Sequence, residues 1–232
     1  MAQMPLNKYI AQAGLCSRRK AVELIKAKKV LVNDQVITEP GHKVSARDEV
    51  QVNGVSLQQQ KLVYILLNKP KDCVSTVSDE RGRTTVLEVI HGATDARVYP
   101  VGRLDRNSTG LLLLTNDGDL AQKLAHPKHQ VQKVYHVTLE RALGRNDFER
   151  VKRGVHLEDG VVQVDAIEHI PPSKKKLKIT LHSGKYRVIR RLFKQLGYKV
   201  VALDRVKYAV FTKRGLSRGT WRFLSHDEVA QL

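Results

Sequence analysis

The sequence predicts an α+β fold in which a small N-terminal unit precedes a larger domain with a mixed, mainly antiparallel sheet flanked by helices. Two observations favour this fold. After residue 61, segments with strand patterns and segments with helix patterns do not alternate regularly, as they would in a doubly wound parallel sheet. A polar stretch at 58–61 separates the two parts. We therefore expect domains over 1–57 and 62–232, joined by a linker at 58–61.

The N-terminal unit contains short elements that follow each other closely. Residues Lys8–Ala13 predict a short helix that ends at Gly14, and Ser17 is placed to cap a second helix of about ten residues. The strands predicted after it are Val30–Val32, Gln35–Ile37 and Glu49–Asn53.

The larger domain gives longer patterns. Alternating or continuously apolar runs predict strands at Leu62–Leu67, Gly110–Thr115, Lys133–Glu140, Val161–Ile170, Leu177–His182, Val200–Val210 and Thr220–Leu224. Helical spacing predicts helices at Thr85–Ile90, Asp119–Ala125, Asn146–Arg153, Tyr186–Leu196 and Ser225–Gln231. The last helix begins with Ser225 and Glu228 at the spacing of a capping box.

The chain carries a large excess of positive charge. Among its 232 residues, 41 Lys and Arg stand against 23 Asp and Glu, which leaves a net charge of +18. Basic residues exceed acidic ones on both sides of residue 60, so the excess is not confined to a tail. An enzyme of small metabolites does not need this excess, whereas a polyanion favours it, because each neutralised phosphate releases a counterion. The composition therefore predicts a nucleic-acid partner.

Several other classes of protein are excluded by the sequence. The apolar stretches are too short to span a membrane, and the N-terminus has no secretion signal. Cys16 and Cys73 have no metal-type spacing, and there is no Gly-rich phosphate loop. We expect a cytoplasmic monomer without metal or cofactor, whose chemistry comes from ordinary side chains.

A basic cluster marks the start of the second predicted helix. Arg18, Arg19 and Lys20 follow Ser17, where free backbone N–H groups favour phosphate. Taken alone, the cluster also fits a solvated helix. In its sequence context, however, the run KYIAQAGLCSRRKAVELIKAKKVLVNDQVI resembles the S-four-type RNA-binding module. The resemblance implies that Arg18, Arg19 and Lys20 contact RNA phosphates.

A second informative segment is the polar loop that leads into the apolar strand at 110–115. Asp105 lies there between Arg103 and Arg106, whose charges would keep its carboxylate ionised and able to act as a nucleophile. From spacing alone, a turn aspartate in salt bridges with these arginines is the alternative.

Four segments together resemble a known enzyme family. GRLDRNSTGLLLLTNDG (102–118) is similar to the signature of the pseudouridine synthases. The resemblance is to the branch that contains the A-type synthases of small-subunit rRNA and the B-type synthases of large-subunit rRNA. LLNKPKDCVST (66–76), Lys133-Val134-Tyr135 and GKYRVIRRLF (184–193) match further family motifs in the same order. One position departs from the pattern, because Val188 stands where many relatives have Gln.

The resemblance implies an isomerase that converts uridine to pseudouridine in RNA without cofactor or metal. Asp105 would be the essential carboxylate, attacking the ribose or the uracil ring or assisting glycosidic cleavage. The uridine must be flipped out of its stack, and Tyr135 would stack on the flipped base. Arg190 would pair with Asp105 and hold it ionised. The other basic residues of the motifs would contact RNA, namely Arg103, Arg106, Lys133, Lys185, Arg187 and Arg191.

The predicted helix at 186–196 supports this division of roles. Its spacing places Arg187, Arg190, Arg191 and Lys194 on a basic stripe, and Val188, Ile189, Leu192, Phe193 and Leu196 on an apolar one. The N-terminal module and the run LLLLTNDGDLAQKLAHP resemble the B-type synthases of large-subunit rRNA, and this resemblance implies large-subunit ribosomal RNA as the partner. Two alternatives stay open: a synthase of small-subunit rRNA or tRNA, and a non-catalytic ribosome-assembly factor that binds RNA.

Overall fold

The computed structural model describes residues 3–232 and divides by its contacts into two units. One unit contains the chain up to Val63 together with Thr94–Val98 and Asn116–Gly118, and the other contains the rest. No helix in the described range is long and apolar enough to cross a membrane.

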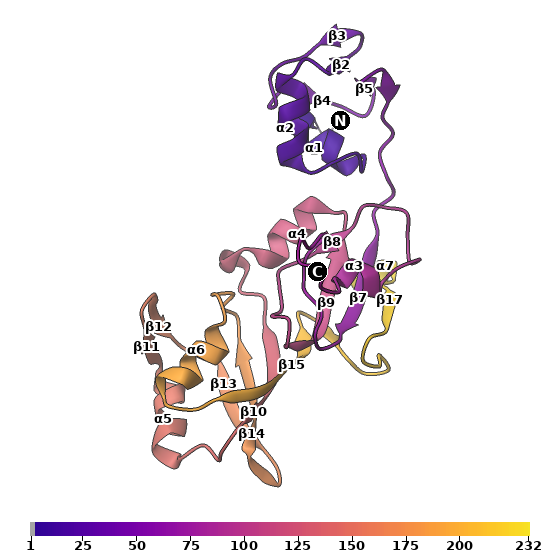
Figure 1. The fold of residues 1–232 in the computed structure, drawn as a ribbon. Helices are drawn as coiled ribbons and strands as arrows, with labels where there is room; N and C mark the ends of the chain where they lie inside the picture. The colour runs from indigo at the N-terminus through magenta and orange to yellow at the C-terminus, as the bar shows by residue number, and fades with distance from the viewer. Residues whose placement is uncertain (1–2) are drawn as a thin grey trace. The chain divides into compact units, whose positions relative to one another are not determined.

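The N-terminal unit packs two helices against short strands (Figure 1). Its elements are β1 (Met4–Pro5), α1 (Leu6–Gln12), α2 (Arg18–Lys26), β2 (Val30–Val32), β3 (Gln35–Val36), β4 (Lys43–Val44), β5 (Val50–Val52) and β6 (Val55–Ser56). The sheet order is β3-β2-β5-β6, and β1 pairs with β4. The predicted cap of α2 is confirmed, since the Ser17 side chain accepts a hydrogen bond from the Lys20 backbone N–H at 3.2 Å. Leu6, Ile10 and Ile25 are fully buried in the core of this unit.

The larger unit is built on a sheet that has nine strands among the described residues. Its strands and helices are β7 (Tyr64–Lys69), α3 (Val86–Val89), β8 (Tyr99–Pro100), β9 (Thr109–Thr115), α4 (Gly118–Ala125), β10 (Lys133–Leu139), α5 (Arg145–Arg153), β11 (Val155–Leu157), β12 (Gly160–Val162), β13 (Ala166–Ile170), β14 (Ser173–Leu181), α6 (Val188–Gln195), β15 (Val200–Tyr208), β16 (Phe211–Thr212), β17 (Trp221–Phe223) and α7 (His226–Ala230). The main strand order is β13-β14-β10-β15-β9-β7-β17. The expected mixed, mainly antiparallel sheet is confirmed.

One parallel contact joins the two antiparallel halves of this sheet. Strands β15 and β9 pair in parallel at Asp204 with Thr109 and at Arg205 with Gly110. The backbones come very close here, because a Cβ at Gly110 would lie 2.3 Å from the Arg205 carbonyl oxygen. Gly110 also has a φ of +107°, which side chains disfavour. A glycine is therefore required where the two halves meet.

Bounds shift at several predicted elements, as at β14, which begins at Ser173 instead of Leu177, and two further differences bear on the site. The single strand expected at Val161–Ile170 is wrong, because β12 pairs with β11 in a separate hairpin and β13 joins the main sheet. The helix expected at Tyr186–Leu196 starts instead at Val188, since Arg187 has a left-handed backbone with φ of 46°. Arg187 thus precedes the helix and is not part of a helical stripe. The apolar stripe is confirmed by the burial of Val188, Ile189, Leu192, Phe193 and Leu196.

Candidate active site

Asp105 lies in the loop that leads into β9, and hydrogen bonds fix this loop on both sides of it. The Ser75 hydroxyl accepts from the Leu104 N–H at 3.1 Å and donates to the Leu104 carbonyl at 3.0 Å. The Ser108 N–H donates to the Asp105 carbonyl at 3.0 Å. The backbone position of Asp105 is therefore set by the fold before any ligand binds.

Lys69, at the end of β7, supports the same loop from within the protein. Its side chain is fully buried, and Nζ donates to the carbonyls of Pro70 at 3.0 Å, Arg106 at 3.2 Å and Ser108 at 2.9 Å. Burial lowers the pKa of Lys69 to about 8. The sequence analysis did not single out Lys69; the available signal was a lysine that ends an apolar strand within the 66–76 motif.

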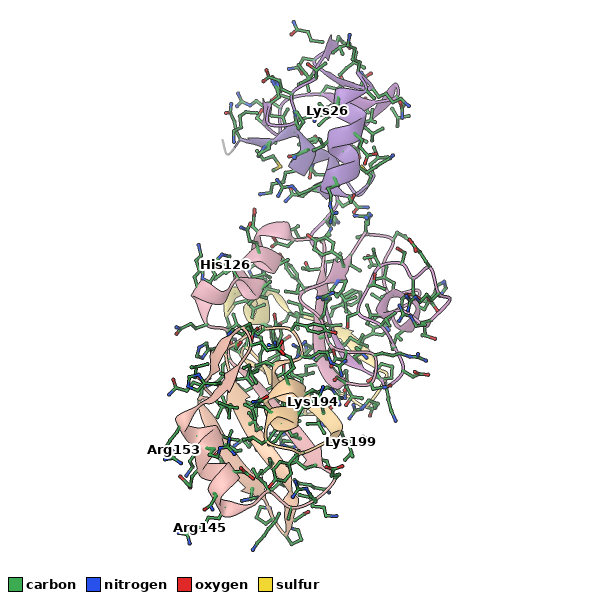
Figure 2. The ribbon with its side chains drawn as sticks, turned by 60° about the vertical axis from the view of Figure 1, so that its left-hand side comes forward. Lys26, His126, Arg145, Arg153, Lys194 and Lys199 are labelled. Atoms are coloured by element: carbon green, nitrogen blue, oxygen red, sulfur yellow. The ribbon has the colours of Figure 1, made fainter. Side chains whose placement is uncertain are left out.

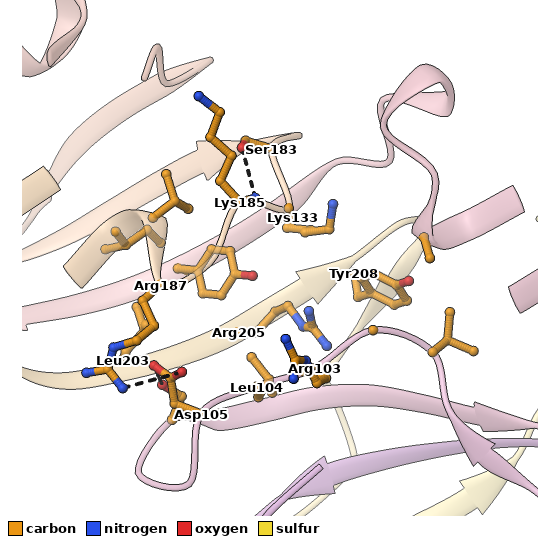
Figure 3. A pocket seen from close by; sticks show the side chains of 18 of the residues that line it. Arg103, Leu104, Asp105, Lys133, Ser183, Lys185, Arg187, Leu203, Arg205 and Tyr208 are labelled. Carbon is orange, nitrogen blue, oxygen red and sulfur yellow. Dashed lines mark hydrogen bonds and ion pairs between the residues drawn. The ribbon is translucent and has the colours of Figure 1, made fainter. Parts of the chain in front are cut away.

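The Asp105 carboxylate meets two arginines at the start of α6. Arg190 Nε lies 3.2 Å from Asp105 Oδ2, and Arg187 Nη1 lies 3.6 Å from Oδ1, the contact drawn in Figure 3. Ser108 Oγ lies 3.5 Å from Oδ2. Arg190 is itself held in place, because its Nη1 donates to the Val200 carbonyl at 3.0 Å. Asp105 is thus a partly exposed carboxylate with two cationic partners.

The two arginines that flank Asp105 in the sequence, Arg103 and Arg106, do not form the ion pairs described for it. Arg106 Nε pairs with Asp72 at 2.6 Å on the surface, and Arg103 is exposed at the edge of a pocket. The positive charge at Asp105 therefore comes from α6 and the residue before it.

An open pocket of about 170 Å³ lies beside Asp105. Tyr135 on β10 and Arg205 on β15 are cross-strand neighbours and both line it, so their side chains share one face of the sheet. Tyr135 is buried, and Val188 adds an apolar wall. The charged residues that line this pocket are Arg103, Asp105, Lys133, Lys185, Arg187 and Arg205. The pocket is strongly cationic apart from one carboxylate.

Lys133 is half-buried at this pocket. Its Nζ donates to the carbonyls of Val131 and His182, each at 3.0 Å. Burial is the main cause that lowers its pKa to about 8, and the nearby charge of Arg205 lowers it further.

Lys185 and Arg191 both bind the tip of the β11–β12 hairpin. Lys185 Nζ donates to the Asp159 carbonyl at 2.7 Å, and Arg191 Nη2 donates to Asp159 Oδ2 at 2.8 Å. The hydrogen bond from Arg191 lowers the pKa of Asp159. These two residues therefore hold the hairpin against the loop that carries Arg187.

Basic side chains continue beyond the pocket. Arg187, Arg190, Lys194 and Lys199 line a neighbouring hollow, and Figure 2 shows Lys194 and Lys199 close to one another. Arg18, Arg19 and Lys20 belong to the N-terminal unit, where they are exposed and where Lys20 pairs with Glu23 at 2.7 Å. Within the described residues, no group of three or more His, Cys, Asp or Glu could hold a metal ion.

The pocket combines a fixed carboxylate, an aromatic wall and many cations. These features are typical of an enzyme that acts on a single nucleotide of a nucleic acid. The comparisons with known proteins identify the family. Residues 63–195 match the model of the RNA pseudouridylate synthases, and residues 4–50 match that of the S4 domain. The chain therefore belongs to the RNA pseudouridylate synthase family and is a pseudouridine synthase, an isomerase.

Full-length relatives agree. Ribosomal large subunit pseudouridine synthase B of Bacillus subtilis is 41% identical, with 98% of this chain and 94% of that protein covered. An uncharacterized RNA pseudouridine synthase of Aquifex aeolicus is 39% identical over 100% of this chain and 94% of its own. The dual-specificity RNA pseudouridine synthase RluF of Escherichia coli is 35% identical, with coverage of 98% and 77%. A crystal structure of a pseudouridylate synthase matches with a TM-score of 0.68 at 27% identity, covering 98% of this chain and 99% of that one.

Proposed function

We propose that this enzyme converts one uridine of large-subunit ribosomal RNA to pseudouridine, with Asp105 as the reacting carboxylate. The observation that carries the proposal is the ion pair between Asp105 and Arg190 at a pocket walled by Tyr135. The Bacillus subtilis relative supports the large-subunit target. It matches over nearly its whole length, and its name gives the large ribosomal subunit as the place where it acts.

The reaction assigns a role to each of these groups. The N1–C1′ bond of the flipped uridine breaks, a bond from C5 to C1′ forms, C5 loses its hydrogen and N1 gains one. Asp105 attacks the ribose or the ring, or assists the cleavage. Arg190 keeps its carboxylate ionised and oriented. The ring of Tyr135 stacks on the flipped base, as aromatic side chains do in sites that receive unstacked bases.

The N-terminal domain, residues 1–57, acts in this proposal as a docking module. Arg18, Arg19 and Lys20 contact RNA phosphates at the N-terminus of α2, where backbone N–H groups also favour anions. A linked module raises the effective concentration of the second binding site without touching the chemistry. The enzyme acts as a monomer in the cytoplasm.

Tritium release tests the activity and the target together. Large-subunit rRNA, small-subunit rRNA and tRNA are labelled with tritium at uracil C5, and only an RNA that is isomerised loses the label to water. We expect release from large-subunit rRNA. Release from small-subunit rRNA or tRNA alone would contradict the target. Binding without release from any of them would support a non-catalytic RNA-binding factor instead.

The variant Asp105→Asn tests the role of the carboxylate. The amide keeps the shape but is neither nucleophile nor base, so we expect turnover below about a thousandth of wild type, with RNA affinity within a few-fold. Asp227→Asn, which changes an exposed carboxylate on α7, is the matched control and should behave as wild type. Turnover above that level in Asp105→Asn would remove Asp105 from the reaction.

A further inference from the structure

Arg205 is a buried cation that the roles above leave unexplained. Its side chain is 3% exposed, and Nε donates to the Leu111 carbonyl at 2.6 Å. Its guanidinium lies 4.6 Å from the centre of the Tyr208 ring. Nη2 is buried without a hydrogen-bond partner, and Arg205 forms no ion pair with any residue of the described chain.

The contact with Leu111 has a structural cause. Strands β9 and β15 pair only as far as Arg205 and Gly110, so the carbonyl of Leu111 is reached by the Arg205 side chain as the strands diverge. This contact accounts for Nε alone. It leaves the two Nη groups, each with two N–H donors, at the far end of the side chain.

An unpaired buried charge is unfavourable, and buried polar atoms in proteins nearly always find partners. Nη2 of Arg205 needs an acceptor that the described residues do not supply, and Arg205 lies at a pocket where a ligand can offer one. It lines the same pocket as Asp105 and stands opposite Tyr135 in the register of β10 and β15. Figure 3 shows Arg205 among the side chains that line this pocket.

The other cations of the pocket already have partners or are in contact with water. Lys133 donates to two carbonyls, and Lys185 donates to the backbone of Asp159. Arg187 pairs with Asp105, and Arg103 is exposed to solvent. Arg205 is therefore the cation of this pocket that is both buried and short of an acceptor.

A uracil ring offers the acceptors that Arg205 lacks. Its two carbonyl oxygens, O2 and O4, accept hydrogen bonds, and they take up negative charge when the glycosidic bond breaks or when a nucleophile adds to the ring. Arginine stays charged at every relevant pH, and a buried charge such as that of Arg205 interacts more strongly with such an oxygen than an exposed charge would. This reasoning holds for each of the routes left open for Asp105.

We propose that Arg205 binds the uracil ring of the flipped nucleotide, donating from Nη to one ring carbonyl oxygen and stabilising the charge that this oxygen gains during the reaction. The inference rests on the proposed function and adds a residue that touches the reacting base. Nε keeps its hydrogen bond to the Leu111 carbonyl, and this bond holds the guanidinium of Arg205 in a fixed orientation relative to the sheet.

Thio-substituted substrates test this contact atom by atom. The uridine mapped by the tritium assay is replaced, in a stem-loop RNA, by 2-thiouridine or 4-thiouridine, because sulfur is a weak acceptor. We expect one of the two substitutions to lower the kcat of the wild-type enzyme by about 10-fold, as for a hydrogen bond to a charged group. In Arg205→Met the same substitution should lower kcat by less than about twofold, because the contact is already lost. Pseudouridine and its thio forms are measured by nucleoside mass spectrometry.

A purely structural Arg205 would give a different result. Both thio substitutions would then act equally on wild type and variant, and that outcome would overturn the inference, as would a wild-type enzyme insensitive to both. Arg103→Met, which removes an exposed cation of the same pocket, should retain full thio sensitivity.

Two further arms keep the result interpretable. If Arg205→Met does not fold, Arg205→Lys serves in its place, since it keeps the charge but cannot reach both Leu111 and the base, and it should lose the thio sensitivity in the same way. Turnover of unmodified RNA by wild type tests the proposed function separately, so failure there is distinguished from failure of the Arg205 contact.

Discussion

Lys69 donates a hydrogen bond from its buried Nζ to the Ser108 carbonyl at 2.9 Å, three residues beyond Asp105. Ser108 also faces the site, because its hydroxyl lies 3.5 Å from Asp105 and 3.4 Å from Arg190 Nη2. A cation inside the protein thus fixes the turn from which the Asp105 carboxylate projects. The position of Asp105 therefore depends on a residue that is fully buried beneath its loop.

Lys69→Met should disturb this support while filling the same space. Three carbonyls lose their donor, so we expect the free energy of unfolding to fall by about 2–3 kcal/mol and kcat to fall about 10-fold, with a smaller change in KM. Urea unfolding and tritium release measure the two effects. Lys71→Met, an exposed neighbour, is the control and should change neither. Wild-type stability in Lys69→Met would show that the loop does not need this donor.

Arg190→Ala should act on turnover and not on RNA affinity. Asp105 loses its partner at 3.2 Å, so we expect kcat to fall by about 10- to 100-fold, with little change in the salt dependence of binding. Arg190→Lys keeps the charge but loses the planar fork, and should rescue part of the loss. Lys194→Ala, one turn along α6, is the control.

The competing view is that Arg190 belongs to a solvated basic face. It predicts near-normal turnover for Arg190→Ala together with a weaker dependence of binding on salt. Titration of RNA binding between low and high salt, beside the turnover measurement, decides between the two.

RNA affinity should fall as pH rises through the lowered pKa of Lys133. Its ammonium is charged below about pH 8 and neutral above it, and a polyanion favours the charged form. Between pH 7 and 9 we expect Kd to rise by about threefold to tenfold, and to stay nearly constant in Lys133→Arg, which remains charged. Lys176→Arg, at an exposed position, should follow wild type. An equal pH dependence in Lys133→Arg would show that another group is responsible.

The N-terminal cluster should affect binding alone. Replacing both Arg18 and Arg19 by Ala should reduce the slope of log K against log salt by about 1–2, at roughly 0.7–0.9 per lost phosphate contact. Turnover at saturating RNA should barely change. Replacing Lys26 and Lys29 by Ala removes the same amount of charge at the other end of α2. This control should reduce the slope less than the Arg18 and Arg19 variant does. A loss of turnover at saturation in the Arg18 and Arg19 variant would contradict a docking role.

Much of the fold followed from the sequence, because long apolar runs and helix caps are local signals. The run at 111–114 predicts a buried strand, and the capping box of Ser225 and Glu228 is present at the start of α7. The β11–β12 hairpin was missed because the apolar residues at 161–170, which belong to β12 and β13, were joined into one predicted strand. The left-handed backbone of Arg187 leaves no trace in a pattern of residue types.

Site residues could be predicted from the sequence only where they belong to a recognised family motif. Residue spacing alone left Asp105 open as a turn aspartate, and resemblance to a family singled it out. The motif at 66–76 contains Lys69 but does not show its contacts, and no motif contained Arg205, since the contacts of both residues depend on partners brought close by the fold. The carbonyl of Arg106 lies 37 residues from Lys69 in the chain, and that of Leu111 lies 94 residues from Arg205.

Asp105 and Arg190 pair across 85 residues of sequence, and the strand that follows Arg190 must lie beside β9 for the pocket to close. During translation the S4 unit is therefore complete long before the pocket exists. A chain that ends before Arg190 and β15 contains the whole S4 match but lacks the partner of Asp105 and the strand beside β9. The catalytic pocket therefore depends on elements that are synthesised long after the S4 domain.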